Sequence, residues 1–439
     1  MPTLEDPVSI GGLTLSNRLY RAPLLECAGT DSETADRLVE HLEPAAAAGA
    51  GLVCQGATVV TAEGGCAAPR MTRVHDGEFV DTLGAVPEAI HAHGGRVFAQ
   101  LAHGGLRSLE AWHTEANRAA SDPTQLAASR PPAPLRLLDR LGFLHLEPKV
   151  LDTGEVGDLA VAFGEAAARL VAAGYDGIHI SAANMSLVQQ FLSPYYNRRD
   201  DEFGGSLRAR TRFLELIHDE IRARVGDVPL VTKVPCETAA PPFARPRIDK
   251  GTAIRIAERL AAYGFDAVVP VRCSTFWDAS IVRGRYPAEA WADERFSEGY
   301  EAAFGGALRA KMVAALTRLD LTRVGFERAW NMDLCRAVRD VVDVPVLCEG
   351  GVRSRSDVDD ILGANGPTAA DLVGLGRPFY AEPRLPALLL DTAEGRVACR
   401  SCNNCAIPQV SGAEGVCRTP DVLAERGRRE REGVYDPPQ

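Results

Sequence analysis

Four cysteines near the C-terminus have a spacing that suits electron-transfer chemistry. Cys399, Cys402, Cys405 and Cys417 stand in the run ACRSCNNCAIPQVSGAEGVC, a C-x2-C-x2-C-x11-C pattern. Three thiolates spaced in this way can hold one side of an iron-sulfur cubane from a tight loop, and a fourth closes the site from farther along. A structural zinc site usually has two separated C-x2-C pairs instead. The spacing therefore favours a [4Fe-4S] cluster, with a zinc site and free thiols as the alternatives.

Five cysteines outside this run are expected to be buried, unreactive thiols. Five of the 11 cysteines lie in or beside apolar runs, where an inert, reduced side chain is expected. The N-terminus MPTLEDPVSIGG has neither the basic nor the apolar stretch of a secretory signal, and no run of about 18 apolar residues occurs. We therefore expect a cytoplasmic protein without a disulfide framework. The five are Cys54, Cys236, Cys273, Cys335 and Cys348.

Short β-branched runs alternate along the chain with Ala- and Leu-rich amphipathic segments. This alternation is typical of βα units around a parallel sheet. Eight units predict an α/β protein with a (β/α)8 TIM barrel, whose active site lies at the C-terminal ends of the strands. The expected strands are 18–24, 51–56, 96–101, 176–181, 229–234, 266–271, 344–349 and 371–376, and expected helices are 35–50, 164–174, 209–225, 251–264 and 331–342.

An open, doubly wound sheet is the competing architecture. Such a sheet usually has a glycine-rich dinucleotide turn after its first strand. The pattern G-x-G-x-x-G does not occur in this chain. The sequence therefore favours the barrel.

Two long excursions and a tail depart from the βα alternation. The excursions cover about 102–151 and 272–328, and both leave from C-terminal ends of strands, where they are expected to form lids over the active site. We expect the barrel to occupy 1–385 and a C-terminal iron-sulfur extension to occupy 386–439.

The net charge of -11 argues against nucleic acid and against an anionic membrane surface as partners.

The residues around the fourth expected strand resemble a known family. The segment AGYDGIHISAANMSLVQQFLSPYYNRRDDEFGGSLRARTRFL is similar to the signature of the old yellow enzyme superfamily, the NADH:flavin oxidoreductases. SNRLYRAPL, AQLAHGG, EGGVRS and DLVGLGRPFYAEP follow in the order of that family, over about residues 7–386. The cysteine tail narrows the resemblance to the branch that contains trimethylamine dehydrogenase and 2,4-dienoyl-CoA reductase. It implies FMN in the barrel and a [4Fe-4S] cluster after it.

Glycines at the ends of the last two strands suit a phosphate. Backbone N–H groups can approach a phosphate closely there, and helix N-termini favour its charge. Turn geometry alone would also explain an isolated glycine pair. We predict that the phosphate-binding residues are Gly350, Gly351, Gly376 and Arg377.

The resemblance also implies which residues contact the flavin ring. Gln100 would hydrogen-bond to the pyrimidine edge, which needs both a donor and an acceptor. Lys233 stands where the family usually has arginine and would stabilise negative charge on the reduced flavin. Pro23, Leu24 and Ala57 would line the ring near N5.

The substrate-binding positions depart from the family pattern. The family commonly has two histidines, or His and Asn, three residues apart, followed by a tyrosine that donates a proton. Those positions are Ser181, Asn184 and Ser186 here. Asn184 can hold a substrate oxygen, but neither serine is an acid near neutral pH, so another proton donor or another reaction is required. We take His103 as the best acid/base candidate.

A histidine and a cysteine near the expected active site are weaker candidates for chemistry. His179 shares a strand face with Ser181 and is a weaker candidate, because a buried core histidine is the better explanation of it. Trimethylamine dehydrogenase attaches its flavin through a cysteine at the position of Leu25, so that covalent link is not expected. Cys27 lies two residues further on, and an unreactive thiol explains it as well as chemistry does.

The branch continues past its cluster into dinucleotide-binding domains, whereas this chain ends at Gln439. The resemblance implies hydride transfer between FMN and a small organic substrate, either as reduction of a C=C bond or as the reverse desaturation. Electrons would pass through the cluster to a separate carrier or reductase, or NAD(P)H would reduce FMN directly. Amine dehydrogenation, a non-catalytic flavin-binding subunit and a zinc hydrolase are the alternatives. A homo-oligomer is one option that the sequence leaves open.

Overall fold

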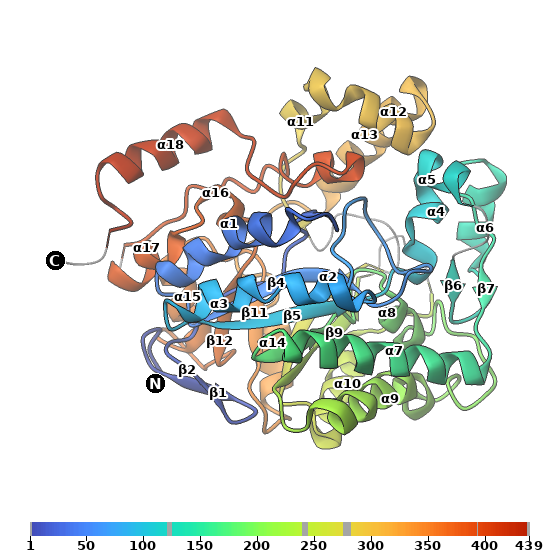
Figure 1. The fold of residues 1–439 in the computed structure, drawn as a ribbon, viewed down its shortest axis with the longest axis horizontal. Coiled ribbons are helices and arrows are strands. Elements are labelled where there is room, and N and C mark those ends of the chain that lie inside the picture. The colour runs from blue at the N-terminus through green and yellow to red at the C-terminus, as the bar shows by residue number, and fades with distance from the viewer. Residues whose placement is uncertain (1, 121–124, 239–244, 275–281, 393, 437–439) are drawn as a thin grey trace.

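A computed structural model describes residues 2–120, 125–238, 245–274, 282–392 and 394–436. Eight parallel strands form its centre (Figure 1). Their order is β10-β9-β8-β5-β4-β3-β12-β11, and a bridge between Val268 and Val346 joins the two outer strands into a ring. The predicted (β/α)8 barrel is confirmed. The strands are β3 (Leu19–Arg21), β4 (Leu52–Val59), β5 (Arg96–Ala102), β8 (Gly177–Ile180), β9 (Leu230–Glu237), β10 (Ala267–Cys273), β11 (Leu347–Glu349) and β12 (Leu372–Leu375).

Four strands, β3, β8, β11 and β12, are shorter than the sequence predicts, and prolines border two of them. β3 ends at Arg21, before Pro23, and β11 begins at Leu347, after Pro345. Proline has no N–H to donate to a neighbouring strand, which disfavours extending β3 through Pro23 or β11 through Pro345, although the ladder accommodates Pro235 in β9 and Pro270 in β10. As a consequence, Pro23 and the residues after it lie in a loop at the rim of the barrel.

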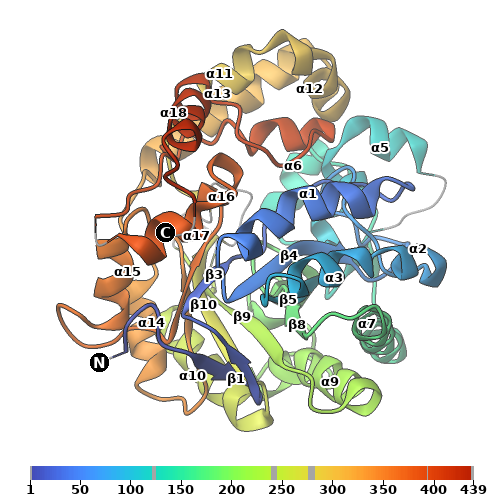
Figure 2. The same ribbon diagram turned by 60° about the vertical axis from the view of Figure 1, so that its left-hand side comes forward.

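Helices follow the strands and cover the outside of the ring (Figure 2). Local signals set their ends: Asp152 and Glu155 form a capping box at the start of α7, and Gly264 ends α10 in the left-handed conformation. All five predicted helices are present. The covering helices are α1 (Thr34–Ala47), α3 (Ala85–His91), α7 (Thr153–Ala172), α9 (Leu207–Val225), α10 (Lys250–Tyr263), α14 (Met332–Arg339), α15 (Arg355–Leu362) and α17 (Leu385–Asp391).

The barrel interior is filled by side chains. Tyr20, Phe98 and Val269 belong to a buried cluster that also includes Ile10 and Leu15. The last two come from the N-terminal hairpin of β1 (Val8–Ile10) and β2 (Leu13–Leu15), which therefore closes the bottom of the barrel. The opposite end is left for the site.

Helices occupy much of both excursions. The first contains η1 (Gly105–Arg107), α4 (Leu109–Trp112), α5 (Thr114–Ala119) and α6 (Ala133–Arg140), with a short parallel pair of β6 (Leu126–Ala127) and β7 (Lys149–Val150). The second contains α11 (Ala288–Ala292), η3 (Glu294–Phe296), α12 (Ser297–Phe304) and α13 (Ala307–Arg323). Figure 1 shows α11, α12 and α13 above the barrel, with α5 and α6 at its side.

The tail packs against the barrel and the second excursion. Beyond α17 come the cysteine loop, η4 (Ile407–Ser411) and α18 (Pro420–Arg431). Arg429 in α18 forms an ion pair of 2.7 Å with the buried Glu382, and Asn404 donates a hydrogen bond of 2.8 Å to Glu289 in α11. Among the described helices, none combines the length and apolar character that crossing a bilayer requires.

Candidate active site

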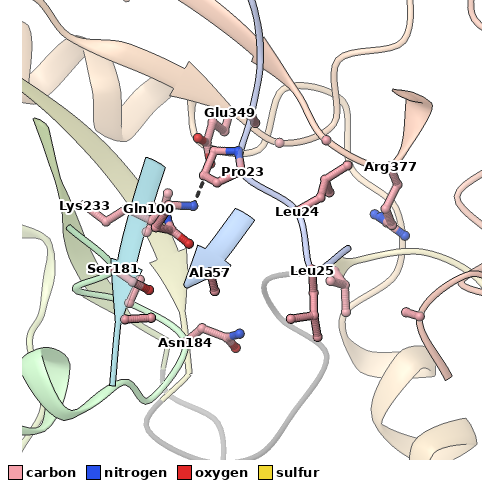
Figure 3. A pocket seen from close by; sticks show the side chains of 18 of the residues that line it. Pro23, Leu24, Leu25, Ala57, Gln100, Ser181, Asn184, Lys233, Glu349 and Arg377 are labelled. Carbon is pink, nitrogen blue, oxygen red and sulfur yellow. Dashed lines mark hydrogen bonds and ion pairs between the residues drawn. The ribbon is translucent and has the colours of Figure 1, made fainter. Parts of the chain in front are cut away.

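A cavity of about 390 Å³ opens at the C-terminal ends of the strands (Figure 3). Residues far apart in the sequence meet around it because parallel strands place their C-terminal ends together. Every sequence-predicted flavin and substrate residue lines it. They are Pro23, Leu24, Ala57, Gln100, His103, Ser181, Asn184, Ser186, Lys233, Gly350, Gly351, Gly376 and Arg377.

A buried ion pair fixes the loop that carries Pro23 and Leu24. Arg21 Nη1 lies 2.8 Å from Glu26 Oε1, and both side chains are almost fully buried. The other oxygen of Glu26 accepts a hydrogen bond of 3.0 Å from Gly56 N. A Cβ at Gly56 would lie 1.2 Å from the Leu24 carbonyl oxygen, so only glycine permits this approach. The loop is thereby held against the end of β4.

Gln100 has its amide oriented by His179. Gln100 Nε2 donates a hydrogen bond of 2.9 Å to His179 Nδ1, and His179 is buried beneath the cavity rather than in its wall. Burial, with a smaller effect of Lys233, holds the pKa of His179 well below its usual value. A neutral imidazole that accepts from Gln100 leaves the amide oxygen and the second amide hydrogen of Gln100 for a ligand.

Lys233 is paired inside the cavity, which the sequence did not predict. Its Nζ lies 2.8 Å from Glu349 Oε2 (Figure 3). Tyr20 donates a hydrogen bond of 2.9 Å to Glu349 Oε1. Glu349 begins the EGG run, which sequence reasoning used only for its glycines. An acidic residue at the C-terminal end of a barrel strand was the signal that could have identified it.

Glycines and arginines define one side of the cavity. Gly350 and Gly351 have φ of +100° and +76°, values that favour glycine. Arg353 and Arg377 line the same side, next to the ends of β11 and β12. Arg353 Nε is buried without a hydrogen-bond partner, and the pKa of Arg353 is lowered first by burial, with Arg377 nearby acting in the same direction. A half-buried arginine that forms no ion pair with any described residue, beside backbone N–H groups, fits the phosphate of FMN.

The expected substrate side is a strained turn after β8. Asn184 and Met185 have φ of 60° and 61°, in the left-handed region that non-glycine residues rarely adopt. Ser186 Oγ donates a hydrogen bond of 2.6 Å to the Ser181 carbonyl and caps α8 (Leu187–Leu192). The hydroxyl of Ser186 is thus used by the turn, whereas the side chains of Ser181 and Asn184 face the cavity (Figure 3).

His103 lines the cavity with both ring nitrogens engaged by the backbone. Gly105 N donates to its Nδ1 at 3.1 Å, so Nε2 carries the proton and donates to the Glu63 carbonyl at 3.2 Å. Burial lowers the pKa of His103 to about 4. This arrangement holds the turn after β5 and does not favour His103 as a proton donor.

Cys27 is held as an unreactive thiol. It is buried, and burial raises its pKa to about 12. Leu25, which lines the cavity, has its carbonyl oxygen bonded by Tyr380 Oη at 2.7 Å. Cys27 therefore provides no thiolate for attachment of a flavin, and the position that lines the cavity is a leucine.

The four C-terminal cysteines line one small hollow. Ser401 and Asn403, between the first three cysteines, have φ of 51° and 64°, which turns the loop tightly. Burial raises the pKa of Cys405 to about 12 and also raises those of Cys399 and Cys417. In the described part of the chain, no three His, Cys, Asp or Glu side chains have the arrangement of a metal site as they stand. The donor chemistry, four thiols around one hollow, still fits a thiolate-bound cluster.

The cysteine hollow and the cavity share a wall. Arg377, Tyr380 and Ser401 line both of them. Arg377 donates to Asn403 of the cysteine loop, and Arg353 Nη2 donates to the Cys399 carbonyl at 2.8 Å. The two arginines on the glycine-rich side of the cavity therefore also hold the cysteine loop.

Comparisons with known proteins agree with this geometry. The N,N-dimethylglycine/sarcosine dehydrogenase of Chromohalobacter salexigens is 26% identical over 94% of this chain and 52% of its own length. The cinnamate reductase of Clostridium sporogenes is 27% identical over 92% of this chain and 54% of its own. The chain thus spans about half the length of these relatives. The histamine dehydrogenase of Rhizobium sp. 4-9 shares the fold, with a TM-score of 0.73 and 21% identity over 96% of this chain and 53% of that one.

The family match covers more than half of the chain. Residues 3–243 match the NADH:flavin oxidoreductase / NADH oxidase family. The match spans β1 to β9 and includes the segments that supply Gln100, Asn184 and Lys233 to the cavity. The predicted resemblance to the old yellow enzyme superfamily is confirmed: the chain belongs to the NADH:flavin oxidoreductase / NADH oxidase family.

Proposed function

We propose that the cavity binds FMN and that the chain transfers hydride between FMN and a small organic substrate. The reaction is the reduction of an activated C=C bond or the reverse desaturation. The wall of Arg377, Tyr380 and Ser401 between cavity and cysteine hollow carries this proposal. When bound, FMN would exchange a hydride with the substrate, and a [4Fe-4S] cluster would exchange single electrons with a carrier.

The residues of the chain have separate tasks in this proposal. Arg353 and Arg377 hold the phosphate together with the backbone of Gly350, Gly351 and Gly376. Gln100, oriented by His179, hydrogen-bonds to the pyrimidine edge of the ring. Lys233 lies next to that ring with its charge balanced by Glu349. Pro23, Leu24 and Ala57 exclude water from the reacting edge.

On the substrate side, Asn184 is the residue best suited to hold a substrate oxygen. Its side chain borders the cavity, and no described residue forms a hydrogen bond with that side chain. Ser181 lies beside it. Because His103 and Ser186 give their polar hydrogens to backbone carbonyls, we propose that the proton in the reaction comes from water.

The cysteine loop is proposed to hold the cluster through Cys399, Cys402, Cys405 and Cys417. An external electron carrier or reductase would then exchange electrons with it, or NAD(P)H would reduce the flavin at the cavity. Amine dehydrogenation is the second candidate, supported by the named activity of the Chromohalobacter relative. The named activity of the Clostridium relative supports C=C reduction.

The first experiment is the visible spectrum of the anaerobically purified protein, with flavin, iron and sulfide content. We expect a flavin band that bleaches with dithionite, and about four irons per chain. Bleaching by NADH or NADPH would identify a self-sufficient reductase, and bleaching by dithionite alone would point to a carrier. A protein that cannot be loaded with FMN would overturn the proposal.

A matched pair of variants tests the cysteine loop. Cys402→Ala should lose iron and sulfide and retain flavin, because the cavity does not include Cys402. Cys54→Ala removes a buried thiol inside the barrel and should retain both. Zinc in place of iron in the unchanged protein would support a structural zinc site instead.

A further inference from the structure

A third arginine lies in the wall of the cavity, far from the phosphate side. Arg107 ends η1, in the excursion that follows β5, and its Nη1 donates a hydrogen bond of 2.8 Å to the Asn184 carbonyl after β8. In the order of the ring, β4 and β3 separate β5 from β12, where Arg377 lies. Arg107 therefore belongs to the substrate side of the cavity.

No carboxylate balances the charge of Arg107 within the described residues. Among the described residues of the whole cavity wall the only acidic one is Glu349, at the end of β11, and it is engaged by Lys233 and Tyr20. The described residues also provide no acceptor for Nε or Nη2 of Arg107. These two atoms form the side of a guanidinium that grips a carboxylate through two parallel hydrogen bonds.

The charge of Arg107 persists at neutral pH. Burial lowers its pKa to about 10, and the group stays protonated several pH units below that value. A partly desolvated cation without a counter-ion favours binding of an anion. The anion would replace lost water with charge-assisted hydrogen bonds.

We propose that Arg107 binds the carboxylate of the substrate, and that the substrate is a 2-enoate, an α,β-unsaturated carboxylate. This inference rests on the proposed function and names its substrate class. A carboxylate could also come from an N-methylated amino acid, but the ammonium group of such a substrate finds no free acidic partner in the described cavity wall. The positive charge beside Asn184 would oppose it further.

The reaction balances with the electron donors already proposed. A hydride from reduced flavin adds to the β-carbon, the π bond of the C=C group breaks, and a proton from water adds to the α-carbon. The product is the saturated carboxylate, and NAD(P)H or the electron carrier reduces the flavin again. Arg107 offsets the negative charge of the carboxylate, which otherwise disfavours hydride addition.

The test compares an anionic and a neutral substrate of the same shape on the flavin-loaded protein. For Arg107→Gln we expect KM for trans-cinnamate to rise about 10- to 100-fold, the effect of losing a charged hydrogen-bond donor. KM for cinnamaldehyde should change less than about 3-fold, and Arg107→Lys should recover part of the loss. Arg140→Gln, on the exposed end of α6, is the control and should match the unchanged protein.

The outcomes separate this inference from the proposed function. Equal losses for cinnamate and cinnamaldehyde would show that Arg107 only supports the Asn184 turn, and would overturn the inference while hydride transfer stands. Calorimetric titration of 3-phenylpropanoate, with and without flavin, measures carboxylate binding apart from turnover. Tighter binding of N,N-dimethylglycine than of 3-phenylpropanoate would overturn the 2-enoate assignment. Failure to load FMN would overturn the proposed function itself.

Discussion

Lys233 in the middle of β9 and Glu349 at the end of β11 form an ion pair inside the barrel. The Nζ to Oε2 distance is 2.8 Å, and the two side chains are only 9% and 12% exposed. Tyr20 occupies the second oxygen of Glu349. The cation expected beside the flavin is therefore part of a neutral pair rather than an isolated charge.

Removing Lys233 alone should destabilise the protein strongly. Lys233→Met leaves Glu349 buried without its counter-ion, which costs about 3–5 kcal/mol in comparable buried pairs. The double variant Lys233→Met/Glu349→Gln should recover most of that free energy of unfolding, because neither charge remains. Urea denaturation of the unchanged protein and of these two variants measures the effect. A double variant as unstable as Lys233→Met would show that the two charges do not compensate each other.

The residues expected to bind the flavin phosphate should distinguish FMN from riboflavin. Arg353→Met should weaken FMN binding about 10- to 100-fold, because a charge-assisted hydrogen bond to phosphate is lost. Riboflavin has no phosphate, so its affinity should change little. Fluorescence titration of both flavins gives the ratio, and Arg323→Met at the exposed end of α13 is the control. Equal weakening of both flavins would place Arg353 outside the phosphate site.

Most of the barrel could be predicted because its strands are contiguous apolar runs. The strand ends and much of the cavity wall followed from that placement and from the family resemblance. Glu349, Arg353 and Arg107 were missed for a physical reason: their roles depend on which strand ends and loops meet across the ring. No local periodicity records that Arg107 reaches the carbonyl of Asn184. Most helices within the excursions are short, and the longer α13 buries only two of its side chains, Ala310 and Leu321, so these helices leave a weak periodic signal.

Replacing one partner of the buried pair Arg21 and Glu26 should destabilise the protein as much as replacing one partner of Lys233 and Glu349. Glu26→Gln leaves Arg21 buried with a weaker partner, and it replaces one acceptor oxygen by an amide. We expect a loss of about 3 kcal/mol or more in the free energy of unfolding. Flavin affinity should also fall, because Glu26 holds Gly56 and the loop of Pro23 and Leu24. Glu33→Gln, an exposed acid nearby, should alter neither quantity.

His103 predicts how stability depends on pH. Its pKa is about 4 in the folded protein and about 6.5 when unfolded, so between these values the unfolded chain binds more protons. Stability should therefore fall as the pH drops from about 6.5 to 4, and His103 alone contributes about 3 kcal/mol to that loss. Above pH 7 this contribution is fully present.

The variant His103→Asn separates titration from packing. An asparagine oxygen can still accept from Gly105 N, but the side chain no longer binds a proton near pH 5. We expect somewhat lower stability at pH 7.5 and a shallower fall between pH 6.5 and 4.5, measured by urea denaturation at each pH. The pH profile of substrate turnover should keep its shape, because both ring nitrogens of His103 are committed to the backbone. If the rate of turnover in His103→Asn no longer fell on one side of the pH optimum, His103 would instead be the proton donor that replaces the family's tyrosine, whose position is Ser186 here.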